Sequence, residues 1–254
     1  YNEGNSVPNC SFSSIIADSD INSPTVWDIN VVLQNEVEVN SELTISNINV
    51  YAENEGKLII NNGGSVVISG TNFDAINCPA KWQGIQLNDG GALEFHDTRV
   101  FNAEIGLEIL STQFSSSGNC SISDCDTGLL IENSGAVNIN PEDNHVAILD
   151  FFIDSPVRTV NSAVVFLGCA FAANVTCVNS AIFTNPSNNR KTSFFSCQLH
   201  YMSGPRLMID DSFFNNEGLT SVDVDQCDYF TVCRSFFNSF LNYAIVSDDV
   251  DKID

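Results

Sequence analysis

Acidic side chains in the C-terminal part of the chain have the types and the spacing that could do chemistry. Asp210 and Asp211 are adjacent, and Asp223 and Asp225 are separated by a single valine. Hydrolases that invert a glycosidic bond use nearby carboxylates, one to protonate the leaving oxygen and one to activate water. These four aspartates are therefore the candidate catalytic residues if the chain cleaves a polysaccharide.

A lyase would need a different arrangement, in which calcium or a cation neutralises carboxylates beside a basic residue. Asp223, Asp225 and Arg206 supply those residue types, but nothing in the sequence fixes them together. A simpler interpretation of Asp223 and Asp225 is a half-buried strand whose polar face is in water, and we favour it over a catalytic or calcium site. The leading hypothesis thus contains no catalytic residue and no cofactor, with calcium as the alternative.

The histidines give no further catalytic pattern. His96, His145 and His200 are far apart in the sequence, and no nucleophile-elbow motif accompanies them. Each is predicted to be a turn or surface residue rather than a general base.

The chain has nine cysteines, which is many for a reducing compartment and is an odd number. There is no Cys-x-x-Cys motif and no histidine close to a cysteine pair, which argues against zinc. We expect some disulfides and an oxidising environment, with buried thiols as the alternative. The candidate pairs are Cys120–Cys125, Cys169–Cys177, Cys227–Cys233 and Cys10–Cys78.

An internal repeat indicates the elements that must position all of these residues. Residues 84–87 (GIQL), 106–109 (GLEI) and 128–131 (GLLI) recur at an offset of 22, and 98–102 match 120–124 at the same offset. Residues 212–215 and 235–238 both read SFFN, at an offset of 23. A period of this length, with short alternating runs separated by Gly, Asn, Asp and Ser, is typical of stacked coils of strands.

The sequence therefore predicts an all-β, right-handed parallel β-helix. Propeller blades have periods of about 40 residues or more, and no hexapeptide pattern supports a left-handed helix. At one coil per repeat and about 4.8 Å per coil, nine or ten coils would form a rod roughly 45 Å long. We expect Leu107 to lie between Ile85 and Leu129 in an aliphatic inner column, and asparagines to form ladders and left-handed turns.

The repeat also divides the chain. Residues 1–30 lack it and are predicted to be an N-terminal cap or crossing segment, whereas residues 31–254 form the coils. Residues 113–118 and 186–191 are predicted to be projecting loops. Because the last coil has no covering helix, we expect further chain or a partner to cover it.

Composition excludes several partners. With 32 acidic and 9 basic residues the net charge is −23, which disfavours nucleic acid and anionic membrane surfaces. No run reaches the roughly 18 apolar residues of a membrane-spanning helix, so no membrane insertion is expected. Doublets among the 18 phenylalanines are predicted to place one ring in the core and one ring on an outer, interface-forming face.

The segment 56–71 (GKLIINNGGSVVISGT), followed by Cys78 and 82–85 (WQGI), resembles the β-helix repeats of large bacterial surface proteins exported by the type IX pathway. The resemblance covers residues 40–135 well and the remainder through the generic repeat. It implies a secreted or cell-surface protein, and the family includes adhesins, stalks and polysaccharide-active proteins.

The sequence thus favours an extracellular structural module for adhesion or assembly, with other protein subunits or surface components as partners and no catalysis. The alternative is a β-helix that binds or degrades polysaccharide. Ice binding ranks last, because no array of Thr-x-Thr motifs is present.

Overall fold

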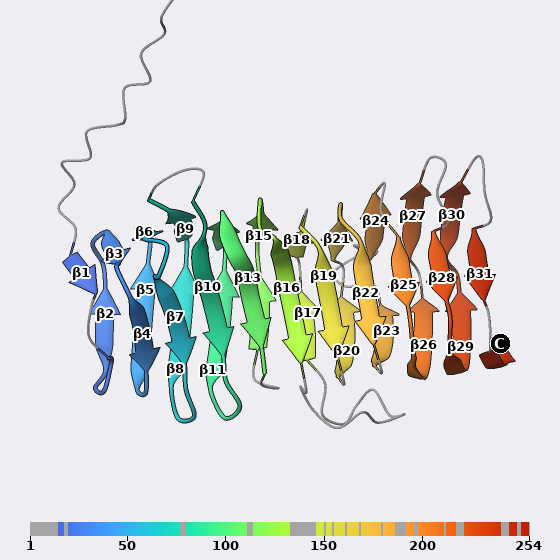
Figure 1. Cartoon of the computed structure of the whole chain (residues 1–254), viewed down its shortest axis with the longest axis horizontal. Helices are drawn as coiled ribbons and strands as arrows, with labels where there is room; N and C mark the ends of the chain where they lie inside the picture. The colour runs from blue at the N-terminus through green and yellow to red at the C-terminus, as the bar shows by residue number, and fades with distance from the viewer. Residues whose placement is uncertain are drawn as a thin grey trace, which may run out of the picture.

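The computed structural model shows short strands wound into a parallel β-helix (Figure 1). All pairings between named strands are parallel, and the described residues contain no helix, which confirms the predicted all-β solenoid. The structure describes residues 15–17, 20–76, 80–110, 114–132, 146–149, 151–153, 155–160, 162–167, 169–178, 180–185, 192–195, 198–210, 212–216, 221–239, 244–247 and 250–253.

Consecutive strands of a coil belong to different sheets, so the chain visits three faces in turn. The first face, sheet A, has eleven described strands. They are β1 (Ile15–Ala17), β3 (Val31–Leu33), β6 (Asn49–Ala52), β9 (Asn72–Ala75), β12 (Arg99–Phe101), β15 (Cys120–Ser123), β18 (Phe151–Ile153), β21 (Ala170–Phe171), β24 (Ser193–Phe195), β27 (Phe213–Asn216) and β30 (Phe236–Ser239).

The second face, sheet B, carries the longest uninterrupted aliphatic column and has ten described strands. They are β4 (Glu36–Val39), β7 (Lys57–Ile60), β10 (Trp82–Leu87), β13 (Ala103–Ile109), β16 (Thr127–Glu132), β19 (Val157–Val160), β22 (Val175–Val178), β25 (Leu199–Tyr201), β28 (Val222–Val224) and β31 (Ile245–Ser247).

The third face consists of two sheets, C and D, which continue one another because β14 and β17 lie side by side. Sheet C contains β2 (Thr25–Trp27), β5 (Glu42–Ser46), β8 (Ser65–Ser69), β11 (Ala92–His96) and β14 (Phe114–Ser117). Sheet D contains β17 (Val146–Leu149), β20 (Ala163–Leu167), β23 (Ala181–Asn185), β26 (Gly204–Asp210), β29 (Cys227–Cys233) and β32 (Val250–Ile253).

Alternation of apolar and polar residues determines which side of each strand faces the core. In β8, Val66 and Ile68 are fully buried. They alternate with Ser65, Val67 and Ser69, which are partly exposed. Successive side chains of a strand point to opposite faces, so every second residue faces the core. Because the coils stack in register, the inward-facing side chains of one coil lie on those of the next. The hydrophobic core is therefore a spine that runs along the helix axis.

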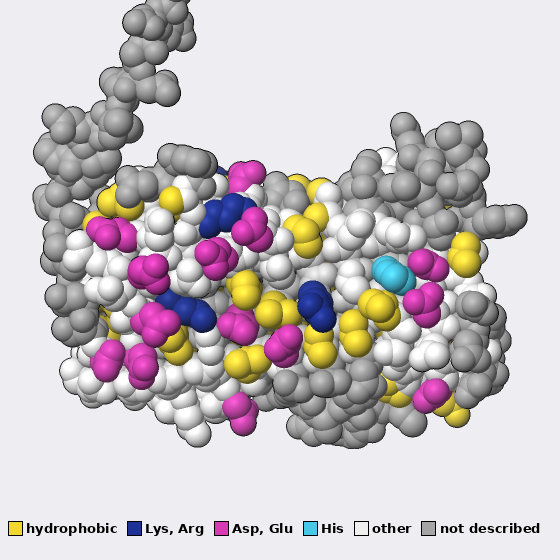
Figure 2. Space-filling view, viewed as in Figure 1, with side chains coloured by type: hydrophobic (Ala, Val, Ile, Leu, Met, Phe, Trp, Pro, Cys, Tyr) yellow, Lys and Arg dark blue, Asp and Glu magenta, His cyan; other side chains and the backbone are white. Residues whose placement is uncertain are grey.

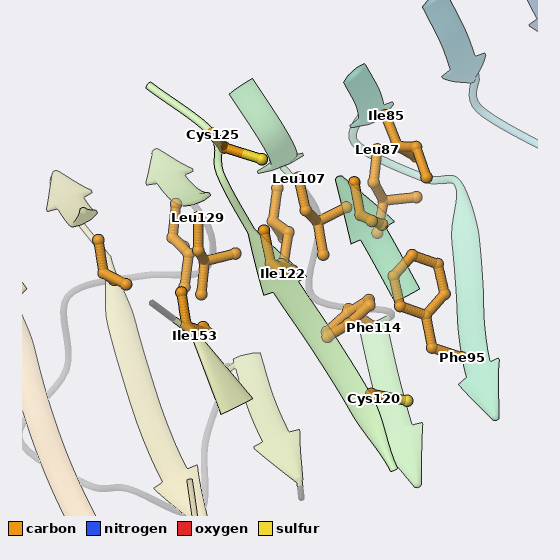
Figure 3. Close-up of a cluster of buried hydrophobic side chains, with 14 of the residues drawn as sticks. Ile85, Leu87, Phe95, Leu107, Phe114, Cys120, Ile122, Cys125, Leu129 and Ile153 are labelled. Atoms are coloured by element: carbon orange, nitrogen blue, oxygen red, sulfur yellow. The ribbon is translucent and has the colours of Figure 1, made fainter. Parts of the chain in front are cut away.

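The predicted inner column of sheet B is confirmed. Leu107 pairs in register with Ile85 on one side and Leu129 on the other, and all three side chains are at most 1% exposed (Figure 3). Gly84 departs from the repeat, because it lies opposite Ile105 rather than Gly106 and the register shifts just after it. Its φ of 98° is a conformation that favours glycine, and this bulge restores the alignment of the aliphatic residues.

In sheet A the inner column changes from aliphatic to aromatic toward the C-terminus. Phe171, Phe194, Phe214 and Phe237 occupy successive coils, with ring centroids 5.1, 4.4 and 4.7 Å apart. The predicted core position of one ring from each doublet is thus confirmed for Phe194 and Phe214, which are fully buried.

Turns between the sheets use asparagine and aspartate as expected. Asn102 and Asp124, which match at the offset of 22, both have left-handed backbones, with φ of 52° and 56°. Side-chain amides of Asn88, Asn61 and Asn40 donate in sequence to the next asparagine oxygen, at 2.8, 3.0 and 3.1 Å, the last to Asn22. These hydrogen bonds connect polar side chains of successive coils.

Three expectations concern segments that the sequence predicts to lie outside the regular coils. Within residues 1–30, β1 pairs with β3 and β2 pairs with β5, and a cap for this region stays a prediction. The predicted loop at residues 113–118 is wrong for 114–117, because these residues form β14 and pair in register with β11. The predicted loop at 186–191 lies outside the described residues.

Candidate functional site

The outward-facing residues of sheet B form a column that changes chemistry along the rod (Figure 2). Residues at the same position in successive coils pair in register, so each column member is flanked by its equivalents above and below. From the N-terminal end the column contains Glu38, Ile59, Gln86, Glu108, Leu130, Arg158, Thr176, His200, Asp223 and Val246.

The N-terminal part of this face is a polar network centred on Lys57. Its ammonium group donates to the amide oxygen of Gln86 and lies 3.7 Å from a carboxylate oxygen of Glu108. Gln86 in turn donates to Asn88 at 2.6 Å, which joins the network to the asparagine ladder. These contacts link side chains from three successive coils on this face.

The C-terminal part brings together His200, Asp223 and Asp225. His200 in β25 pairs in register with Asp223 in β28, and its Nε2 lies 3.6 Å from Oδ2 of Asp223 and 3.3 Å from Oδ2 of Asp225. Potential ligand atoms of the three side chains all lie within 4.8 Å of one another. Figure 2 shows a histidine beside acidic side chains over this end of the rod.

Local backbone structure fixes the three groups. Val222 and Val224 are buried, so alternation in β28 turns Asp223 outward, as the half-buried strand interpretation predicted. The backbone N–H of Asp225 donates to the carbonyl of Tyr201 at 2.9 Å, which holds Asp225 beside the end of β25. The side chains are 31–50% exposed and therefore remain accessible from solvent.

His200 was not selected from the sequence as a site residue, although a signal for it exists. The SFFN repeat has an offset of 23 residues, and the same offset carries His200 onto Asp223. Applying the offset to polar residues as well as to phenylalanines would have placed an imidazole beside a carboxylate.

The four candidate aspartates do not form one catalytic group. Asp223 and Asp225 lie on sheet B, whereas Asp210 ends β26 on sheet D and its carboxylate accepts hydrogen bonds from Nε and Nη2 of Arg234, the former at 2.9 Å. Asp211 lies outside the described residues. Arg206 is also in β26, so the structure does not bring the suggested lyase residues together on one sheet.

The three predicted local disulfides are not formed. Cys227 and Cys233 are the ends of the seven-residue strand β29, about 20 Å apart at roughly 3.3 Å per residue, whereas bridged Cα atoms lie within about 7 Å. Cys120 is the first residue of β15, whereas Cys125 follows the end of this strand at Ser123, and Figure 3 shows the two side chains apart.

The third predicted disulfide, Cys169–Cys177, is also not formed, because the two cysteines lie at different sheets. Cys177 lies in β22 of sheet B, whereas Cys169 directly precedes β21 of sheet A. Extended strands thus separate cysteines that are close in the sequence. Cys10 and Cys78 lie outside the described residues.

A second surface feature is an outward column on sheet A. Phe152, Ala170, Ser193, Phe213 and Phe236 pair in register through successive coils. Phe152 and Phe236 are 42% and 56% exposed, and the rings of Phe213 and Phe236 stack with centroids 5.5 Å apart. The expected outward ring of the doublets is therefore present at these positions.

Comparison with known proteins gives no match: no family model, no curated protein and no solved structure is similar to this chain. Among the residues that the structure describes, no helix is long and apolar enough to cross a membrane.

Proposed function

We propose that this chain is a structural β-helix module that acts in adhesion or assembly outside the cell. The parallel coils supply a rigid scaffold on which equivalent side chains form long columns, a geometry suited to extended contact surfaces. The partners would be other protein subunits or surface components.

The outward phenylalanines of sheet A are the observation that carries this proposal. Phe213 and Phe236 stack on each other at the surface, and Phe236 keeps 56% of its area exposed. Each large aromatic side chain buried in a contact contributes roughly 1.5–3 kcal/mol, so a partner that covers this column gains affinity. Stacked surface aromatics of this kind are typical of protein contact sites.

The net charge of −23 supports the extracellular part of the proposal. Strong like charge keeps a protein soluble and reduces nonspecific contacts in a salty medium. An adhesive contact made mainly by an apolar column would also persist at ionic strengths that screen ion pairs.

Binding of the purified chain to the isolated cell envelope of the producing organism tests the proposed role. We expect Phe236→Ser to weaken binding at least tenfold, because the variant loses the most exposed ring of the column. Val26→Ser is the matched control, since Val26 is 64% exposed but lies on sheet C. Equal binding of wild type and Phe236→Ser would contradict the proposal, and so would equal losses in both variants.

Location is tested separately on intact cells. Protease added outside should remove the protein while a cytosolic marker stays intact. Persistence of the protein under these conditions would place it inside the cell and overturn the extracellular role.

The exposed cluster of His200, Asp223 and Asp225 favours a second candidate, binding or cleavage of polysaccharide. Potential ligand atoms of its two carboxylates and its imidazole lie within 4.8 Å of one another, an arrangement that could hydrogen-bond a sugar. Assaying a panel of uronate and neutral polysaccharides for new reducing ends distinguishes the two, and turnover that is lost in Asp223→Asn would establish an enzyme.

A further inference from the structure

Strand stacking concentrates three metal-ligating side chains on the outer face of sheet B, independently of the proposed adhesive role. His200 and Asp223 are direct neighbours across the ladder between β25 and β28, and Asp225 follows on the same side. The backbone hydrogen bond from Asp225 to Tyr201 fixes the position of the third group. The donor atoms therefore come from two successive coils that are tightly hydrogen-bonded to each other.

The spacing of the donor atoms fits a small coordination sphere. Zinc binds imidazole nitrogen and carboxylate oxygen at about 2.0–2.2 Å, so neighbouring ligands of a tetrahedral site lie roughly 3.3–3.6 Å apart. Nε2 of His200 lies 3.3 and 3.6 Å from the two carboxylate oxygens. An ion can thus reach the imidazole and either carboxylate without a change in the backbone.

The donor set also selects the class of ion. One imidazole nitrogen and two carboxylate oxygens suit zinc and neighbouring divalent transition metals, whereas calcium takes six to eight oxygen ligands and magnesium keeps several waters. Because the three side chains are 31–50% exposed, water has access to complete the coordination sphere.

We propose that His200, Asp223 and Asp225 bind one divalent transition-metal ion, with zinc preferred to calcium, and that the ion joins two successive coils. A cross-link between β25 and β28 would stabilise the C-terminal coils against separation, since a ligand that binds only the folded state stabilises it by RT ln(1 + [L]/Kd).

Calorimetric titration of zinc into the full chain, first treated with a chelator, tests the site. We expect one zinc ion per chain and at least tenfold weaker binding in His200→Ala and in Asp225→Asn. His96→Ala is the matched control: His96 lies 3.5 Å from Glu94 on sheet C, but its partners in the ladder are serines, Ser69 and Ser117. Its zinc affinity should equal that of wild type.

Two further measurements use only the wild-type protein, so they do not depend on whether the variants fold. In wild type, zinc should shift the NMR signals of the His200 ring and raise the thermal midpoint, and calcium at the same concentration should do neither. Absence of zinc binding, tighter binding of calcium, or equal loss in His200→Ala and His96→Ala would overturn the proposal.

Discussion

Three polar side chains occupy one inner column of sheet B where earlier coils have isoleucine and leucine. Thr159, Cys177 and Tyr201 are fully buried and stack in register. Burial raises the pKa of the Cys177 thiol to about 12, although a hydrogen bond with Thr159 opposes this. The Tyr201 hydroxyl donates to the carbonyls of Ser180 and Arg206, the latter at 3.1 Å, and burial also raises the Tyr201 pKa. Both groups therefore stay protonated in the folded chain.

This burial predicts a loss of stability in alkaline solution. The Cys177 pKa rises from 9.0 in its ordinary state to about 12 in the fold, so the folded state holds a proton that the unfolded chain releases. The contribution is present below pH 9 and declines as the pH rises from about 9 to about 12. In urea titrations across that range, Cys177→Val should reduce the slope of unfolding free energy against pH by about one proton.

The comparison has a direct control. Both proteins should show similar pH dependence below about pH 8, where the thiol is almost entirely protonated in either state. If the unfolding free energy fell equally steeply with alkaline pH in wild type and Cys177→Val, the Cys177 thiol would not release a proton on unfolding. That result would contradict the prediction.

A second prediction concerns the thiols of β29. Cys227 and Cys233 lie at opposite ends of an extended strand, and Cys227 is buried whereas Cys233 is partly exposed. Burial raises the pKa of the Cys227 thiol, which slows its reaction further. Native alkylation should thus modify Cys233 at least tenfold faster than Cys227.

Peptide mapping after unfolding without reductant completes this test. A peptide that spans both residues should carry two alkyl groups. A disulfide between them would leave that peptide unmodified and would contradict the extended conformation of β29.

The candidate site shows where sequence reasoning stops. Asp223 and Asp225 are visible as a pair of like residues within the sequence, and their strand alternation is predictable from it. The contact with His200 depends on the register between coils, which varies along this chain. Segments that form one coil differ in length, so a fixed period does not specify which polar side chains meet.

At the scale of elements, the aliphatic column makes the stability of β13 depend on its neighbours. Leu107 is fully buried between Ile85 and Leu129, whereas Leu130 points outward in the next strand. Leu107→Ala should lower the unfolding free energy by about 2–5 kcal/mol, because it removes apolar contacts and leaves a cavity in the spine. Denaturant titration monitored by circular dichroism measures this loss.

Leu130→Ala is the matched control for that substitution. It removes the same atoms from a partly exposed position, so it should lower the unfolding free energy by no more than about 1 kcal/mol. Equal effects of the two substitutions would mean that Leu107 does not occupy the inner column.

Regular elements were predictable wherever alternation and the repeat agreed, as in residues 84–87, 106–109 and 128–131. The structure differs where tertiary pairing overrides local preference. Serine-rich 114–117 resembles a loop by composition, but Phe114 is buried in register with Leu93, and the ladder with β11 holds the segment as β14. The bulge at Gly84 could not be predicted either. The repeat has one constant offset in this region, whereas the register between β10 and β13 shifts just after Gly84.

At the scale of the whole molecule, repulsion between acidic side chains opposes the stacking of the coils. Parallel coils place equivalent positions about 4.8 Å apart, and the chain carries 32 acidic against 9 basic residues. Ion pairs such as Lys57–Glu108 and Lys81–Asp126 neutralise part of this charge, but a net charge of −23 remains. Repulsion among the acidic side chains must therefore reduce the stability of the rod.

This opposition predicts that salt stabilises the protein. The screening length is about 30 Å in 0.01 M salt, which spans several coils, and falls to about 8 Å at 0.15 M. The thermal midpoint should thus rise by several degrees between these concentrations of sodium chloride at pH 7. If the ion pairs dominated instead, the same salt would lower the midpoint, because screening weakens attractions and repulsions alike.

Repeating the salt titration near the isoelectric point separates charge repulsion from other effects of salt. The sequence gives an isoelectric point of about 4.1, where the net charge approaches zero and long-range repulsion disappears. The rise in thermal midpoint should therefore be much smaller at that pH than at pH 7. A rise of the same size at both values would mean that salt acts through apolar burial, which does not depend on the charge of the rod.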